Sequence, residues 1–184
     1  MAVTTLDPRT ALILIDLQNG IVSLPTAHPV GEVVRQAAIL AEVFRARGLP
    51  VVLVNVAGGA PGRTEQPPRS WDFPAGWTDL VPELNAQPGD HRVTKRSWGA
   101  FTKTGLEDHL RGLGVTQVVL AGVATSIGVE STARQAYELG FNVTLATDAM
   151  TDMRAEAHDN SILRIFPRLG ELGATQEIVD LFAR

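Results

Sequence analysis

QVVLAGVATSIGVESTARQA, residues 117–136, is the stretch that decides the fold of this chain. The apolar run Gln117–Ala121 predicts a strand buried on both faces, and Val129–Ala136 predicts a helix that follows closely. A strand, turn and helix in this order hold one residue at the carboxyl end of a sheet, beside backbone N–H groups at the positive end of the helix. Many hydrolases place a Ser or Cys nucleophile at such an elbow. Here the position is Gly128 and the whole chain contains no cysteine, so the elbow lacks the usual nucleophile.

The rest of the chain alternates between strand and helix patterns. Apolar runs predict strands at Ala11–Ile15, Val51–Val56, Arg92–Thr94 and Asn142–Ala146, and a last short strand that begins at Gly173. Helices are predicted at Glu32–Arg47, Leu106–Leu113, Val129–Leu139, Ala155–Ile165 and Gln176–Phe182. Such alternation implies βαβ units, and therefore a Rossmann-like α/β fold of three layers with a mostly parallel six-stranded sheet. We expect residues 1–184 to form one domain.

Composition narrows the class of protein. The chain has 184 residues, of which 45% are hydrophobic and 20% charged, as in ordinary globular domains. It has no apolar run near the roughly 20 residues that span a membrane, and its first residues lack a secretory pattern. The absence of cysteine excludes disulfides and makes a cytoplasmic location the default expectation. A net charge of −4 argues against nucleic acid or an anionic membrane as the main partner.

Polar residues that matter for function follow the predicted strands. Asp16 ends the run LILIDLQ at residues 12–18, and Lys95 lies in VTKRSWGAF at residues 93–101. Together with the elbow at Gly128, these motifs resemble the isochorismatase-like hydrolase family, also called the cysteine hydrolases. The resemblance runs from about Thr10 to the C-terminus. It implies the isochorismatase fold, with Asp16 and Lys95 as catalytic residues at the carboxyl edge of the sheet.

The departure from the family pattern lies at the nucleophile. Family members carry Cys where this chain carries Gly128, so thiol-based amidase chemistry is not carried over. Glycine at this position is similar to the true isochorismatases, which cleave an enol ether without a covalent nucleophile. Neither Ser126, two residues before the elbow position, nor Ser131, nearly one turn beyond it, is placed to replace the thiol.

Further residues are expected in the substrate site: Val123, Ala124, Thr125, Gln18, Trp98, Phe101 and Asn55. By resemblance, the Val123–Ala124 peptide bond is cis and the N–H groups after it help to form an oxyanion hole. Gln18 matches the family pattern as a residue that supports the site, and Asn55 ends a strand at the same edge. Trp98 and Phe101 follow Lys95 and are candidates for the pocket wall, although a core position is equally open for each. Thr125 is also open to a purely structural hydrogen bond within the turn.

The segment Gly58–Gly76 is rich in Gly, Pro and polar residues, which predicts a long loop of the kind that often covers a site. Arg63 in this loop has the chemistry to hold a carboxylate, but a solvated arginine is the favoured interpretation. We expect no metal and no cofactor. Some relatives, the nicotinamidases, bind a metal through an Asp-x-His pair and a further His, and the four histidines here do not form that spacing: His28, His91, His109 and His158.

These residues support one favoured function and two alternatives. The favoured one is hydrolysis of a small anionic substrate, with Asp16 as the acid that protonates an enol ether and Lys95 as its partner. In the second, Asp16 is a general base that activates water against an amide or ester. In the third, the protein is a degenerate family member that binds a ligand or assembles with partners without catalysis. The resemblance also implies a homodimer or homotetramer formed through the helices beside the elbow.

Overall fold

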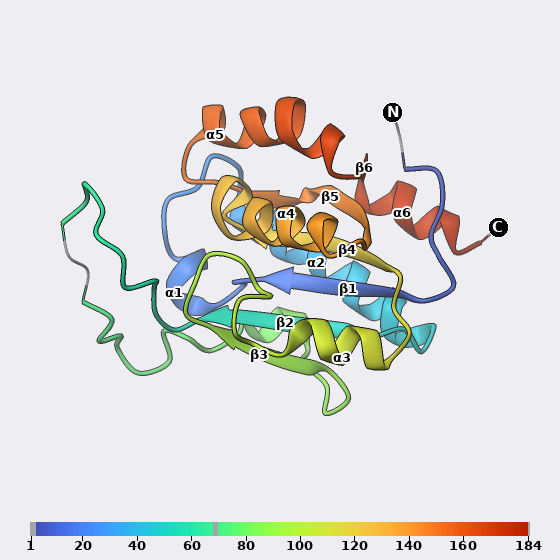
Figure 1. The fold of residues 1–184 in the computed structure, drawn as a ribbon, viewed down its shortest axis with the longest axis horizontal. Coiled ribbons are helices and arrows are strands. Elements are labelled where there is room, and N and C mark those ends of the chain that lie inside the picture. Colours follow the sequence, from blue (N-terminus) through green and yellow to red (C-terminus); the bar gives the residue numbers. More distant parts are fainter. Residues whose placement is uncertain (1–2, 68–69, 184) are drawn as a thin grey trace.

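A computed structural model describes residues 3–67 and 70–183 and contains a six-stranded parallel sheet (Figure 1). Its order is β3-β2-β1-β4-β5-β6, and every adjacent pair of strands is parallel. The strands are β1 (Thr10–Ile15), β2 (Val51–Val56), β3 (His91–Lys95), β4 (Gln117–Val123), β5 (Asn142–Thr151) and β6 (Glu171–Gly173). This confirms the predicted α/β fold with a parallel six-stranded sheet.

Helices cover both faces of the sheet. They are α1 (Asn19–Val22), α2 (Val30–Ala46), α3 (Leu106–Gly112), α4 (Glu130–Glu138), α5 (Ala155–Asn160) and α6 (Thr175–Leu181). Shorter helical turns are η1 (Pro82–Leu84), η2 (Thr125–Val129), η3 (Ser161–Ile165) and η4 (Phe166–Arg168). α2 and α6 pack on one face of the sheet, and α3 and α4 pack on the other.

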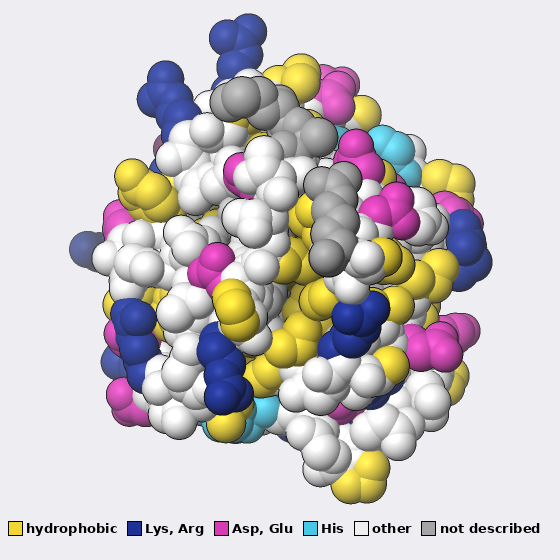
Figure 2. Space-filling view, turned by 90° about the vertical axis from the view of Figure 1, so that its right-hand side faces the viewer, with side chains coloured by type: hydrophobic (Ala, Val, Ile, Leu, Met, Phe, Trp, Pro, Cys, Tyr) yellow, Lys and Arg dark blue, Asp and Glu magenta, His cyan; other side chains and the backbone are white. Residues whose placement is uncertain are grey.

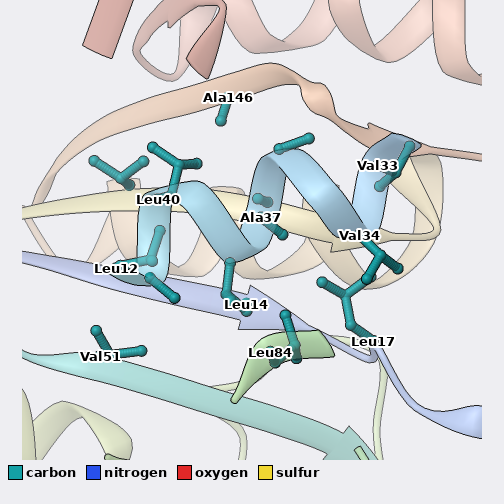
Figure 3. Packing of buried hydrophobic residues seen from close by; sticks show 14 of the residues in the cluster. Leu12, Leu14, Leu17, Val33, Val34, Ala37, Leu40, Val51, Leu84 and Ala146 are labelled. Atoms are coloured by element: carbon teal, nitrogen blue, oxygen red, sulfur yellow. The ribbon is translucent and has the colours of Figure 1, made fainter. Parts of the chain in front are cut away.

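Strand β1 lies between these two helix layers, and its side chains point alternately to one layer and to the other. Leu12 and Leu14 pack with α2 in one core cluster, as Figure 3 shows. Ile13 and Ile15 point to the opposite face and pack with α3 and α4 in a second cluster. This is the alternation that a strand imposes on successive side chains. All of β1 is buried, which explains why its sequence is a continuous apolar run.

Strand β2 has the expected boundaries, β1, β3 and β4 extend beyond theirs by one or two residues, and the last two strands differ more. β5 continues past Ala146 to Thr151, because after an irregularity in the ladder its last residues pair with Gly122 and Val123 of β4. The last strand ends at Gly173, whereas the sequence had predicted that it begins there. Thr175 is instead the first residue of α6, because Asp148 Oδ1 accepts hydrogen bonds from its backbone N–H at 2.7 Å and its hydroxyl at 2.8 Å.

The long loop between β2 and η1 projects beyond the carboxyl ends of the strands, on the left in Figure 1. Trp77 anchors the loop by lying against Gly20 of α1, and Trp71 lies against Gly59 within the loop. Figure 2 shows the opposite end of the molecule, where the strands begin and basic and acidic side chains are interspersed. Among the described residues, no helix is long and apolar enough to cross a membrane.

Candidate active site

Asp16 occupies the turn that directly follows β1. Its backbone adopts φ of 52°, in the left-handed region, while its N–H still donates to the Val54 carbonyl at 2.9 Å. A non-glycine residue with this φ is uncommon and is found most often where function requires it. The side chain is only 5% exposed, so a carboxyl group is held inside the carboxyl edge of the sheet.

Lys95 lies on β3, which β2 separates from β1, and its side chain extends to the Asp16 carboxyl group. It is the last residue of β3, and Lys95 Nζ lies 2.7 Å from Asp16 Oδ2 and 3.1 Å from the Ser97 carbonyl oxygen. Lys95 is 2% exposed, which is rare for a lysine without a partner. The structure therefore brings together the two charged residues expected at the site, as a buried ion pair.

The two oxygens of the Asp16 carboxyl group have different surroundings. Oδ2 accepts the hydrogen bond from Lys95, whereas Oδ1 is buried and has no hydrogen-bond partner among the described residues. Burial raises the pKa of Asp16 from 3.8 to about 6, against the opposing effect of the Lys95 charge. A group with this pKa exchanges a proton close to neutral pH, and Oδ1 is the oxygen left to carry it.

Gly128 faces this carboxyl group. A Cβ atom built on Gly128 would lie 3.2 Å from Asp16 Oδ2 and 2.9 Å from Ile15 Cγ2. The elbow position is thus adjacent to Asp16 and has no side chain of its own. The Gly128 carbonyl accepts a hydrogen bond from Thr132 Oγ1 at 2.7 Å, and Thr132 Oγ1 accepts one from Ala100 N–H at 3.1 Å. Thr132 therefore ties the elbow to the loop that follows Lys95.

The turn before the elbow depends on a close approach of β4 to β1. Gly122 has φ of 123°, and a Cβ atom there would lie 2.0 Å from the Ile15 carbonyl oxygen. Only glycine allows this approach. The Val123–Ala124 peptide bond is cis, as expected from the resemblance. Both residues are buried beside the elbow, and the chain then enters η2 at Thr125.

Thr125 and Ser126 turn their side chains away from Asp16 and toward the end of β5 and α5. Thr125 Oγ1 lies 2.8 Å from His158 Nδ1, and Ser126 donates from its backbone N–H and its hydroxyl to Asp152 Oδ2. The Thr125 hydroxyl thus makes its hydrogen bond to α5 and not within the turn, where the sequence had left one open. His158 and Asp152 were not predicted at the site, because only the fold brings them close to the elbow.

Gln18 is fully buried and joins several segments at this edge. Its amide oxygen accepts from Val56 N–H at 2.7 Å, and its nitrogen donates to the carbonyl oxygens of Val56 at 3.1 Å and Trp77 at 3.4 Å. These bonds attach the end of β2 and the base of the long loop to the turn after Asp16. The geometry is that of a supporting residue.

Asn55 does not face the cleft, contrary to the expectation from sequence. Successive strand residues alternate between faces, so Asn55 shares the face of Leu53 in the α2 layer, while Val54 and Lys95 use the other face. Its amide donates to the Thr78 carbonyl at 2.9 Å and accepts from Thr94 Oγ1 at 2.7 Å. Asn55 therefore anchors the long loop to the sheet edge.

The two aromatic residues after Lys95 have different places. Phe101 is partly buried against the α3 and α4 core, with its ring centroid 5.9 Å from that of Phe141, which supports the core alternative. Trp98 is 65% exposed, and most of its ring faces solvent. The loop after Lys95 thus supplies one core residue and one surface aromatic.

A groove of about 260 Å³ lies between α1 and residues 74–77 of the long loop. A groove of about 630 Å³ lies between α2 and η1, where Arg45 is already bound to Asp90 and to the Leu84 carbonyl. Within residues 3–67 and 70–183, no three His, Asp or Glu side chains form a group able to hold a metal ion.

Comparison with known proteins places the chain in a family. An isochorismatase domain model matches residues 10–177. The uncharacterized isochorismatase family protein YwoC of Bacillus subtilis is 43% identical over 94% of this chain and 93% of its own length. YecD of Escherichia coli O157:H7, which carries the same description, is 44% identical over 93% of this chain and 95% of its own.

The fold also matches solved structures of the family. An isochorismatase family protein from Burkholderia thailandensis superposes with a TM-score of 0.94 at 42% identity, and the match covers 98% of each chain. The matched residues include the whole edge that carries Asp16, Lys95 and Gly128. This chain belongs to the isochorismatase family of hydrolases.

Proposed function

We propose that the protein hydrolyses a small anionic substrate without a covalent enzyme intermediate, and that Asp16 moves the proton. The observation that carries this proposal is the Asp16 carboxyl group, buried beside Gly128, with Oδ1 unpartnered and its pKa raised to about 6. A carboxyl group of this kind serves as a general acid close to neutral pH. The elbow position beside this carboxyl group is glycine, so it offers no side chain that could act as a nucleophile.

Lys95 has two roles in this proposal. Its ammonium group holds Oδ2 at 2.7 Å, which fixes the plane of the carboxyl group and leaves Oδ1 without a hydrogen-bond partner among the described residues. It is also the buried cation nearest to an anionic ligand at this edge. When a carboxylate of the substrate approaches, it competes with Asp16 for the positive charge, which raises the pKa of Asp16 further and favours the acid form.

An enol ether of the isochorismate type suits this arrangement. Asp16 transfers its proton to the methylene carbon, which leaves an oxocarbenium ion on the ether carbon and a carboxylate on Asp16. Water then adds to that carbon and returns a proton to Asp16. In the resulting hemiketal, the bond between this carbon and the ether oxygen that links it to the ring breaks. The products are pyruvate and a diol. No step requires a side chain at Gly128.

A second reaction is favoured by the contact between Asp16 and Lys95. The nearby ammonium group stabilises the carboxylate, and a carboxylate is a general base that would activate water against an amide or ester. A third possibility, a ligand-binding protein without catalysis, is supported by the missing nucleophile alone. The three possibilities differ in the substrates turned over and in the response to loss of Asp16.

The test is a panel of isochorismate, small amides and small esters, assayed with wild type, Asp16→Asn and Asp108→Asn. Asp108 is exposed on α3 and provides the matched control. We expect pyruvate release from isochorismate, a loss of about 100-fold or more in Asp16→Asn, and wild-type rates in the control. Turnover of amides or esters alone supports the general-base reaction. No turnover of any substrate supports the binding protein, and wild-type turnover by Asp16→Asn contradicts both enzymatic proposals.

We also propose that the protein forms a homodimer or homotetramer through the surface around α4. Three large side chains on and beside this helix support it, because they are well exposed: Trp98 at 65%, Tyr137 at 53% and Ile127 at 38%. A monomer by light scattering at micromolar concentration would contradict this proposal.

A further inference from the structure

A buried hydrogen bond fixes the turn behind Gly128. Thr125 Oγ1 and His158 Nδ1 lie 2.8 Å apart, with Thr125 fully buried and His158 only 8% exposed. Thr125 begins η2 and is three residues before Gly128, about one helical turn away. Because its hydroxyl is shielded from solvent and faces α5, Thr125 is not placed to attack a substrate. The hydrogen bond between Thr125 and His158 therefore has a structural role.

His158 is itself held in place by neighbouring groups. Its ring lies 4.6 Å from the ring of His28. His28 in turn contacts Thr151 Oγ1 twice, through Nδ1 at 3.0 Å and through its backbone N–H at 3.2 Å. Next to this pair, Asp152 Oδ2 accepts two hydrogen bonds from Ser126, at 2.7 Å and 2.8 Å. These contacts thus link η2 to the end of β5, to α5 and to the loop before α2.

We propose that His158 is a positioning residue for the active site. Through Thr125 it holds η2 against the turn after β1, and so fixes the backbone N–H groups of the elbow relative to Asp16. The inference rests on the proposed function for its consequence in catalysis, but the positioning itself is a property of the elbow. A backbone segment that is fixed by a buried hydrogen bond keeps the direction of its N–H groups within the small tolerance that a reacting site requires.

The surroundings of His158 favour its neutral ring, which suits this role. Burial and the nearby His28 lower the pKa of His158, against the smaller effects of Asp159 and Asp152. A neutral imidazole and a hydroxyl form one hydrogen bond with either atom as donor. The contact therefore persists at neutral pH without placing a charge under the elbow.

The chain offers a reporter of elbow geometry that does not depend on hydrolysis. It contains no cysteine, so Gly128→Cys introduces a single thiol at the elbow position. Its Cβ atom would lie 3.2 Å from Asp16 Oδ2, and the 2.9 Å contact with Ile15 Cγ2 requires a shift of a few tenths of an ångström by that methyl group. Thiolate absorbance near 240 nm, with the parent chain subtracted, gives the pKa of this thiol directly. The elbow N–H groups and Lys95 stabilise the thiolate and lower that pKa, whereas the Asp16 carboxylate raises it, and the background Gly128→Cys chain sets the balance against which each variant is compared.

Two pairs of variants in the Gly128→Cys background test the proposal. Thr125→Val removes the hydroxyl and keeps the shape of the side chain, whereas Thr125→Ser keeps the hydroxyl. His158→Leu removes the ring nitrogen, whereas His158→Asn keeps a polar atom near its place. Thr144→Val is the matched control, because Thr144 is fully buried on β5 and its hydroxyl accepts from Gln117 Nε2 at 3.0 Å, away from the elbow.

We expect Thr125→Val and His158→Leu to lower the thiolate fraction at a fixed pH by about tenfold, which is one unit in the thiol pKa. Thr125→Ser and His158→Asn should stay within about twofold of the background, and Thr144→Val should not change it. An unchanged thiol pKa in both disruptive variants overturns the proposal, as does an equal change in Thr144→Val. Should Thr125→Val fail to fold, the His158 pair decides. The titration reads the elbow whether or not Asp16 proves catalytic, so failure of one proposal is distinguishable from failure of the other.

Discussion

Asp16 and Lys95 place opposite charges 2.7 Å apart where water reaches neither side chain well. Each charge alone would be costly to bury, and each offsets part of the cost of the other. The pair nevertheless leaves the pKa of Asp16 raised to about 6, because burial outweighs the attraction of Lys95. The balance of these two effects gives a carboxyl group that is stable in the fold and still able to exchange a proton.

Lys95→Met tests this balance at the residue scale. Breaking a buried pair from one side typically costs about 3–5 kcal/mol, and we expect a loss of this size in urea unfolding at pH 8. Without Lys95 the folded pKa of Asp16 rises above about 6, further from 3.8, its ordinary value. The folded state then binds the proton more tightly than the unfolded state, so stability recovers as the pH falls through the folded pKa. The loss should be clearly smaller at pH 5.5.

The control is Lys103→Met, which removes the only other lysine of the chain, an exposed one. We expect it to change the free energy of unfolding by no more than about 0.5 kcal/mol at either pH. A loss in Lys95→Met that is the same at both pH values would show that packing, and not charge, accounts for the effect.

The long loop between β2 and η1 is the element that projects beyond the carboxyl ends of the strands (Figure 1). Trp77 lies directly on Gly20 in α1, where any Cβ atom would be 2.0 Å from the indole. The ring of Phe73 stacks on Trp77 at 3.9 Å, and the Trp77 carbonyl accepts from Gln18. The loop is therefore attached to the turn after Asp16 by the Trp77 ring and by backbone hydrogen bonds, which Gly20 N–H donates to the Trp77 carbonyl and Asn19 N–H to the Asp79 carbonyl, both at 2.9 Å.

Trp77→Ala should release this anchor without unfolding the sheet. If the loop loses about 1.4 kcal/mol of local stability, its open form becomes about tenfold more populated, and trypsin should cleave after Arg63 about tenfold faster. Trp98→Ala removes an equally large side chain that is 65% exposed and outside the loop, and should leave the cleavage rate unchanged. Equal cleavage rates in wild type and Trp77→Ala would mean that the loop is held by other contacts.

Over the whole molecule, the features that the sequence predicts are those that depend on neighbours along the chain. Buried parallel strands need apolar runs, so the strands can be predicted from a single sequence. The positions of Asp16, Lys95 and Gly128 at one edge follow from the order of parallel strands.

The features that the sequence did not predict depend on contacts between distant segments. The face used by Asn55 follows from the register of β2 with β3, and the start of α6 follows from the hydrogen bonds between Asp148 and Thr175. The approach of His158 to Thr125 joins residues 33 positions apart. These contacts cannot be predicted from a local sequence pattern, because they form only when the sheet is assembled.

Asp16 should exchange a proton near neutral pH, and a carboxyl titration by ¹³C NMR tests this without a substrate. The protein labelled at the aspartate carboxyl carbon is titrated from pH 3 to 9, with the Asp16 signal assigned by its loss in Asp16→Asn. We predict a midpoint of about 6 for this signal. A midpoint at or below the ordinary value of 3.8 would show a permanently ionised carboxylate held by Lys95, and would contradict the proposed acid.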